Sequence, residues 1–440
     1  MGDQNYVYIE TYGCSANKNN SEIIAGILRQ SGYQITNNEK IAEILIINTC
    51  IVKGKTETKI KRRIQDLSNL YKSKMIIVAG CMPETDFNSL KRINPHLLLL
   101  GIHHTRDIVK LIKDYNDNKL TKQKGGFYIS NVYEEKLCSP KISTNKLISI
   151  TQISEGCLGE CTFCKVKFAK GSLSSYPQAK IIKSIESDLK SGAKEIWLTS
   201  QDNASYGLDR SKNELPELLK KILSLKHKFK LRLGMMNPNN LFPIINEMIE
   251  IYKNPKMYKF LHIPIQSASD KILVDMNRYY KIEKAEEIIK RFKKEFPDIT
   301  IATDIIVGYP TETEVDHKFN IKFIEEFKPD VFNLSKFSSH KETKAGKLNI
   351  IDKEIINKRA SELMDLHRKT AKENKQKFKD KTIKVFINSK TNIPNIYESR
   401  DENYNIILIN SKDKSILGKN IDVKIKEIGV HHMLGEAISE

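Results

Sequence analysis

Three closely spaced cysteines constrain this 440-residue chain more than any other feature. Cys157, Cys161 and Cys164 follow a C-x3-C-x2-C pattern. Three thiolates can hold three irons of a [4Fe-4S] cluster and leave the fourth iron open, whereas closed structural metal sites use four ligands. An open iron can chelate the amino and carboxylate groups of S-adenosylmethionine, and an electron from the cluster then cleaves the sulfonium to a 5′-deoxyadenosyl radical. The pattern therefore predicts a cluster that binds S-adenosylmethionine.

A zinc knuckle and chance clustering are the alternatives to this prediction. Cys161 and Cys164 have no second C-x2-C pair nearby, and no histidine follows them at zinc-finger spacing. The cysteines follow the alternating, β-rich run 146–153 and precede a helical pattern with apolar Ile181 and Ile185. A loop between a strand and a helix is where a (β/α) fold places its reactive residues, which favours the cluster.

Three further cysteines each follow a short apolar or β-branched run. Cys14, Cys50 and Cys81 come after the runs 6–13, 44–49 and 75–80. Helical segments separate the runs, which is typical of a parallel sheet whose strands share one ligand-binding edge at their carboxyl ends. The positions predict a second three-cysteine cluster site, and the alternative for each cysteine is a small buried hydrophobe. Cys138 matches neither set and is expected to be a free thiol.

The rest of the chain divides into repeated and then alternating patterns. Six strand-helix units begin with the runs 146–153, 195–200, 230–235, 260–266, 300–307 and 331–337. They predict an open, partial (β/α)6 barrel. A charged helical segment follows, and then a period of two in 382–388, 404–409 and 421–428, with Gly418 and Gly435 as turn points. This last part predicts a small β-barrel, an architecture that recurs among oligonucleotide binders.

We therefore expect an α/β chain of three domains. The predicted parts are an amino-terminal parallel-sheet α/β domain (1–115), a linker (116–145), a partial barrel (146–352), a connecting helix (353–380) and a small β-barrel (381–440). Within the linker, the polar stretch 114–126 reads as an exposed loop.

The charge balance is consistent with a polyanionic partner. The formal net charge is +19, from 73 Lys and Arg against 54 Asp and Glu. The alternative is a lysine-rich surface that is merely solvated. No stretch approaches the roughly 18 apolar residues that a membrane span needs, and the first residues lack a signal-peptide core. We expect a cytosolic protein, since thiolate-ligated clusters need a reducing compartment and seven cysteines in a chain this long make no disulfide framework.

Further motifs give the chain a family resemblance. They are His262-Ile263-Pro264-Ile265-Gln266-Ser267, Met276-Asn277-Arg278 and the run 303–310. With both cysteine sets and the order of the three parts, they make the chain resemble the radical-SAM methylthiotransferases over nearly its whole length. The segments 156–159, 165–171 and 234–238 resemble the archaeal and eukaryotic branch of that family.

The resemblance implies an activity. The branch converts N6-threonylcarbamoyladenosine at position 37 of tRNA to its 2-methylthio derivative, using two [4Fe-4S] clusters, S-adenosylmethionine and an electron donor. Cys157, Cys161 and Cys164 would hold the radical cluster, and Cys14, Cys50 and Cys81 the sulfur-delivering cluster. The last part would be an RNA-binding TRAM-like domain. The alternatives are methylthiolation of an isopentenyladenosine tRNA or of a ribosomal protein, and a non-catalytic RNA-binding protein with structural metal.

Six polar residues are candidates for contacts with S-adenosylmethionine. They are Thr199, Ser200, Gln201, Arg232, Gln266 and Asp304. The first three follow the second barrel strand and are placed to meet the amino group or the ribose, while the last two lie on or near later strands. Arg232 could meet the carboxylate or be a structural barrel residue. Single polar residues of this kind also cap loops, so each contact is an expectation only.

The sequence departs from the family pattern at two positions. Lys170 stands where the family commonly has Arg, and Tyr279 follows Arg278 where some branches have Gly. A lysine keeps the positive charge but loses the bidentate fork of a guanidinium, so a phosphate or carboxylate contact at position 170 is expected to be weaker.

Overall fold

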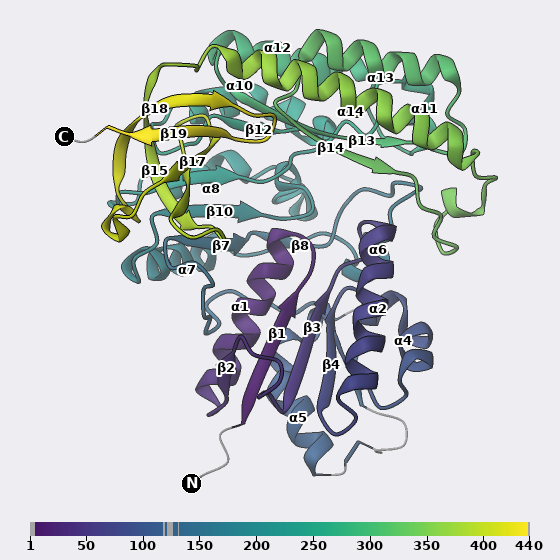
Figure 1. Cartoon of the computed structure of the whole chain (residues 1–440). Helices are drawn as coiled ribbons and strands as arrows, with labels where there is room; N and C mark the ends of the chain where they lie inside the picture. The colour runs from purple at the N-terminus through teal and green to yellow at the C-terminus, as the bar shows by residue number, and fades with distance from the viewer. Residues whose placement is uncertain (1–4, 118, 121–125, 131, 439–440) are drawn as a thin grey trace.

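Three packed regions make up the computed structural model, which describes residues 5–117, 119–120, 126–130 and 132–438. An α/β unit lies at one end, a larger barrel-like unit packs on it, and a small β-barrel closes one side of the latter (Figure 1). These are the fold classes that the sequence predicts. Within the described residues, no helix combines the length and apolarity needed to cross a membrane.

The amino-terminal unit is a parallel sheet of order β2-β1-β3-β4-β5-β6. Its strands are β1 Tyr6–Thr11, β2 Gln34–Thr36, β3 Ile44–Thr49, β4 Met75–Gly80, β5 Leu98–Gly101 and β6 Phe127–Tyr128. Its helices are α1 Ser15–Gln30, α2 Gly54–Leu70, α3 Met82–Thr85, α4 Phe87–Ile93, η1 Ile102–Asp107 and α5 Ile108–Asn116. All six residues of β3 are buried, as expected for a central parallel strand covered on both faces.

Alternate residues of β3 face different helices. Ile44 and Ile46 pack in a core with α1 and α5, whereas Leu45 and Ile47 pack in a core with α2 and α4. Strand β6 lies in the stretch predicted as a linker, yet it pairs with β5. A two-residue strand carries no periodic signal, so the pattern could not reveal it. Residues 118 and 121–125 of the predicted exposed loop lie outside the described part of the chain.

Six parallel strands form the central unit. They are β7 Ile148–Gln152, β10 Glu195–Thr199, β11 Lys230–Leu233, β12 Phe260–His262, β13 Thr300–Val307 and β14 Val331–Lys336. They form two sheets, β11-β10-β7 and β12-β13-β14, which a parallel bridge between Leu231 and Met257 joins. The result is an open, partial barrel.

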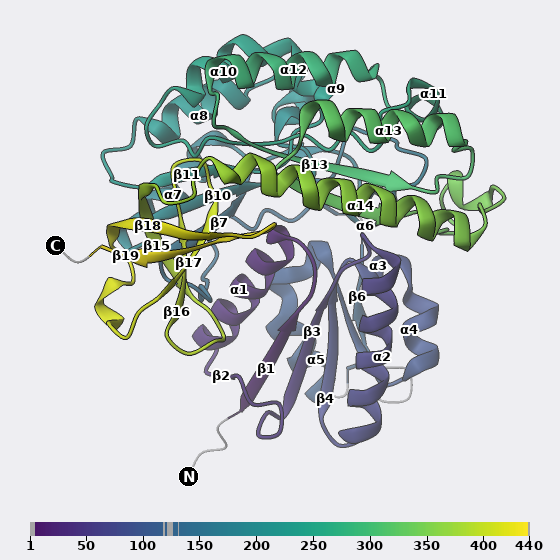
Figure 2. The same cartoon turned by 45° about the horizontal axis from the view of Figure 1, so that its top comes forward.

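Helices cover the outer face of this partial barrel. They pack against its strands in the largest hydrophobic core of the described residues. The longer helices are α7 Gln178–Lys190, α8 Leu215–Leu223, α10 Ile245–Tyr252, α12 Ile282–Glu295 and α13 Glu314–Phe327. Shorter elements are β8 Ser154–Glu155, α6 Val166–Lys170, β9 Ser174–Ser175, α9 Pro238–Leu241 and α11 Asp270–Asp275. Helix α14, Lys353–Gln376, packs along α13 and leads to the last unit (Figure 2).

The carboxyl-terminal unit is a closed five-stranded barrel of order β15-β16-β17-β19-β18. Its strands are β15 Thr382–Lys390, β16 Ile396–Arg400, β17 Ile406–Asn410, β18 Asn420–Ile428 and β19 Met433–Ala437. The sequence patterns predicted three of the five strands. The interpretation of Gly435 as a turn point is wrong, because it lies within β19, where a Cβ would come 2.2 Å from Val423 Cγ1. Gly is needed there for close approach inside the barrel.

The small barrel covers the amino-terminal end of the partial barrel. Asn388 Nδ2 donates to Oε1 of Glu195, the first residue of β10, at 3.0 Å. Tyr404 packs against Tyr258 and Phe260 beside the start of β12. At the opposite end of the partial barrel, segments that follow the strands contact the first unit: Lys165 pairs with Asp86 at 2.6 Å.

Candidate functional site

The first cysteine set occupies the loop between β8 and α6. Each of its thiols has a hydrogen-bond donor: Gly159 N–H donates to Cys157 Sγ at 3.3 Å, Arg278 Nη1 donates to Cys161 Sγ at 3.5 Å, and backbone N–H groups at the start of α6 donate to Cys164. A Cβ placed on Gly159 would lie 3.5 Å from Cys157 Sγ and 3.7 Å from Cys161 Sγ. Such donors stabilise thiolate sulfurs, so the loop suits a thiolate-ligated cluster.

Backbone contacts fix this loop. Gly156 has φ +70°, and a Cβ there would meet the carbonyl oxygen of Ser172 at 1.9 Å, so a glycine is required. Thr162 N–H donates to Met276 O at 3.1 Å, and its hydroxyl donates to Asp275 O at 2.9 Å. The loop is thus held against the end of α11.

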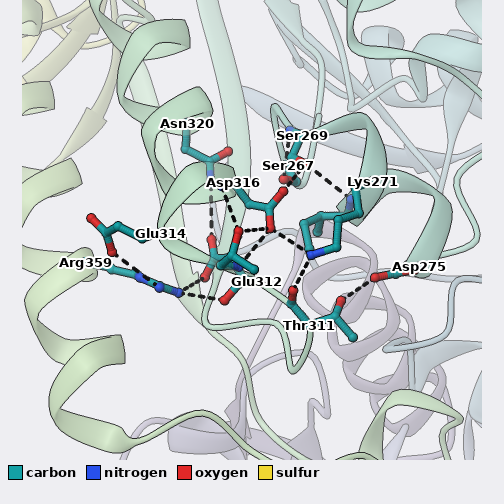
Figure 3. A network of polar contacts seen from close by, with 12 residues as sticks. Ser267, Ser269, Lys271, Asp275, Thr311, Glu312, Glu314, Asp316, Asn320 and Arg359 are labelled. Atoms are coloured by element: carbon teal, nitrogen blue, oxygen red, sulfur yellow. Dashed lines mark hydrogen bonds and ion pairs between the residues drawn. The ribbon is translucent and has the colours of Figure 1, made fainter.

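A polar network joins α11 to α13 and α14 (Figure 3). Asp316 of α13 accepts from the Ser269 hydroxyl at 2.6 Å and pairs with Lys271 at 3.0 Å. Glu312 pairs with Arg359 of α14 at 3.2 Å. The network therefore connects the helices α13 and α14 to α11, which the segment Met276-Asn277-Arg278 follows.

The segment after β10 lies beside the first cysteine set. Thr199 and Ser200 are buried, and Asp202 acts electrostatically on Cys157. The side-chain oxygens Ser200 Oγ and Gln201 Oε1 are buried and have no hydrogen-bond partner within the described chain. Buried polar atoms are normally satisfied, so these two suit a polar ligand at this position.

Gln266, which follows β12, lies close to Asp304 of β13, because its N–H donates to Asp304 O at 2.8 Å. Gln266 forms a parallel bridge with Ile305, and its φ of +69° is unusual for a residue other than glycine. Asp304 Oδ2 lies 2.5 Å from His262 Nε2. From the sequence, His262 was recognisable only as part of a motif. Its position in β12, next to β13 in the sheet, is the signal that could have paired it with Asp304.

Arg232 lies elsewhere in the partial barrel. Its guanidinium carbon lies 5.0 Å from the ring centre of Phe260 and 5.9 Å from the ring centres of Trp197 and Tyr404. Burial lowers the pKa of this arginine. These contacts join the partial barrel to the small barrel, so they favour the structural interpretation of Arg232 over a contact with a carboxylate.

The second cysteine set gathers at the carboxyl edge of the first sheet. Cys14, Cys50 and Cys81 follow β1, β3 and β4, which are adjacent in the sheet. Gly13 has φ +104°, and a Cβ there would lie 2.7 Å from Cys50 Sγ. Burial raises the pKa of Cys81 to about 12, and Cys14 and Cys50 act on it electrostatically.

Helix α6 lies between the two cysteine sets. Its first turn donates backbone N–H groups to Cys164. Its Ala169 belongs to the hydrophobic core that contains Cys50 and Cys81. A five-residue helix rises by only about 7.5 Å, so the two sets are close neighbours.

Cys138 is exposed and belongs to neither set. Among the residues that the structure describes, no three His, Cys, Asp or Glu side chains are close enough to share a single metal ion. Ligation of two clusters by the two sets therefore stays a prediction from the chemistry of the donors.

Comparisons with known proteins match this arrangement. Residues 6–101 match the uncharacterized protein family UPF0004, and residues 151–324 match the radical SAM superfamily. A probable threonylcarbamoyladenosine tRNA methylthiotransferase from Archaeoglobus fulgidus is 36% identical, over 99% of both chains. The threonylcarbamoyladenosine tRNA methylthiotransferase of Homo sapiens is 33% identical, over 99% of this chain and 74% of its own length. The chain belongs to the threonylcarbamoyladenosine tRNA methylthiotransferase family.

Solved structures of radical SAM enzymes share the fold. The methyltransferase TsrM from Kitasatospora setae superposes with a TM-score of 0.56 at 13% identity, covering 78% of this chain and 75% of its own. The cobalamin-dependent enzyme OxsB gives a TM-score of 0.55 at 14% identity, covering 81% of this chain and 56% of its own. At these identities the likeness concerns the fold alone. For this family member, the fold agrees with the class predicted from its sequence.

Proposed function

We propose that the chain is a radical-SAM tRNA methylthiotransferase, which converts N6-threonylcarbamoyladenosine at position 37 to its 2-methylthio derivative. The family membership supports the substrate, since the archaeal and eukaryotic relatives carry this activity in their names. The names of these relatives do not favour the alternatives. Those are an isopentenyladenosine tRNA or a ribosomal protein as the substrate, and a non-catalytic protein with structural metal. The observation that carries the proposal is that α6 places two three-cysteine sets side by side.

Each set has a separate task in this proposal. Cys157, Cys161 and Cys164 would hold a [4Fe-4S] cluster, whose chemistry when bound is one-electron cleavage of S-adenosylmethionine. Cys14, Cys50 and Cys81 would hold the cluster from which sulfur is delivered. Ser200 and Gln201 would orient S-adenosylmethionine through their unpartnered oxygens, with Thr199, Gln266 and Asp304 as further contacts.

The partners follow from the same chemistry. The tRNA would extrude its modified adenosine toward the carboxyl ends of the barrel strands, because a base inside a stack cannot reach the site. An electron donor would be needed as well, because one-electron cleavage of S-adenosylmethionine consumes an electron. We place the protein in the cytosol, since two thiolate-ligated clusters need a reducing compartment.

Two cysteine variants test the division of tasks. Cys14→Ala should still cleave S-adenosylmethionine to 5′-deoxyadenosine but form no methylthio product, because only the sulfur-delivering site is lost. Cys157→Ala should lose both reactions. Cys138→Ala is the matched control, because Cys138 belongs to neither set. Methylthio transfer by Cys14→Ala at the unmodified rate would refute the second cluster site.

A further inference from the structure

Two buried lysines share one buried glutamate at the end of α6. Glu155 lies 2.7 Å from Lys136 Nζ and 3.0 Å from Lys170 Nζ. These three residues, the buried triad, are at most 3% exposed. The two ammonium groups pair with different oxygens of the one carboxylate, Lys136 with Oε1 and Lys170 with Oε2. The buried triad therefore carries one positive charge in excess.

The neighbours of the buried triad do not cancel this excess at Lys170. Burial lowers the pKa of His103, which acts electrostatically on the triad, to about 4, so its imidazole is neutral at pH 7. Two further carboxyl groups, those of Glu84 and Glu134, act on Lys136. Besides Glu155, the groups that act on Lys170 are the thiols of Cys81 and Cys14. An unbalanced charge in a protein interior is costly, so its retention suggests an anion beside Lys170.

The second cysteine set is the place for that anion. Lys170 interacts electrostatically with Cys14, Cys50 and Cys81. It ends α6, which contacts α3, the helix that Cys81 precedes. Its neighbour Ala169 packs in one core with Cys50 and Cys81. The ammonium group is thus fixed, by Glu155 and by the packing of α6, on the side of the three thiols.

We infer that Lys170, held in place by Glu155 and Lys136, is the built-in counter-charge of the amino-terminal cluster and raises its reduction potential. This inference rests on the proposed function, since it needs a cluster on Cys14, Cys50 and Cys81. A [4Fe-4S] cluster held by three thiolates is anionic, and reduction adds one more negative charge. A fixed cation nearby stabilises the reduced form more than the oxidised form. Lys170 is a positioning residue in this account, because it does not touch the substrate.

The midpoint potential of the amino-terminal cluster tests the inference. The full-length chain with Cys157→Ala, Cys161→Ala and Cys164→Ala retains only that cluster, so it serves as the background. In this background, Lys170→Met should lower the reduced-to-oxidised ratio at fixed potential by roughly tenfold, which equals about 59 mV for a one-electron couple. Lys170→Arg should keep the original potential. An EPR-monitored redox titration measures both.

Two more variants separate charge from structural damage. Glu155→Gln removes the shared negative charge, so it should shift the potential upward, opposite to Lys170→Met. Lys141→Met is the matched control, because it removes another partly buried lysine, paired with Asp188, and should leave the potential unchanged. An unchanged potential in Lys170→Met, or shifts of the same sign in Lys170→Met and Glu155→Gln, would overturn the inference. Absence of any cluster in the background chain would instead refute the assignment of Cys14, Cys50 and Cys81, and the inference with it.

Discussion

The buried thiols of both cysteine sets are protonated at neutral pH in the metal-free chain. Burial raises the pKa of Cys81 and of Cys157 to about 12, and it also raises the pKa values of Cys50 and Cys164. A cluster binds thiolates, so its assembly must release protons from these residues. Assembly of a cluster on these thiols therefore becomes more favourable as pH rises.

Alkylation of the metal-free protein tests these thiol pKa values. Only the thiolate reacts with iodoacetamide, so the rates at Cys81 and Cys157 should still rise about tenfold per pH unit between pH 8 and pH 10. Peptide mapping by mass spectrometry measures each site separately. The exposed Cys138 supplies a reference for a thiol without steric protection. A rate plateau at Cys157 below pH 9 would contradict the raised pKa.

Elements with strong apolar patterns were predictable, and weakly patterned ones were not. The six-residue strand β3 is entirely buried and was evident, whereas β16, Ile396–Arg400, is half polar and was missed. The run 260–266 was predicted as one strand, yet β12 ends at His262. Pro264 has no N–H to donate to a neighbouring strand, and Gln266 has a positive φ, so the regular strand cannot continue.

One loop residue, Tyr404, packs at the contact between the two barrels. Tyr404 is 9% exposed, packs on Tyr258 and Phe260, and lies over Arg232. Tyr404→Ala should lower the free energy of unfolding by about 3 to 5 kcal/mol, because it removes a large buried ring. Urea denaturation measures this loss. Tyr404→Phe keeps the ring and should cost much less, so an equal loss in both variants would contradict a packing role.

The relation between the three regions could not be predicted from local patterns. The cysteine motifs identified both candidate cluster sites, since their spacing and their positions after strands are local features. The pairing of Lys170 with Glu155, and that of Asn388 with Glu195, depends on how separate elements pack. The packing role of Arg232 likewise depends on Tyr404 of the small barrel, which the local sequence around Arg232 does not reveal.

The net charge of +19 should make tRNA binding strongly salt-dependent. Lys384 and Lys424 are exposed on neighbouring strands of the small barrel. If both contact phosphates, Lys384→Ala with Lys424→Ala should reduce the slope of log Kd against log salt by roughly one to two. Lys290→Ala with Lys294→Ala on α12 is the control of equal charge. Filter binding over a salt series gives the slopes, and equal slopes for both double variants would exclude the small barrel as a phosphate-binding surface.

Mass spectrometry of tRNA nucleosides tests the proposed activity most directly. The reconstituted protein is incubated anaerobically with S-adenosylmethionine, a reductant and tRNA that contains N6-threonylcarbamoyladenosine. We expect 2-methylthio-N6-threonylcarbamoyladenosine together with 5′-deoxyadenosine. Formation of 5′-deoxyadenosine without the methylthio nucleoside would contradict the proposed substrate, and absence of both products would contradict the radical chemistry itself.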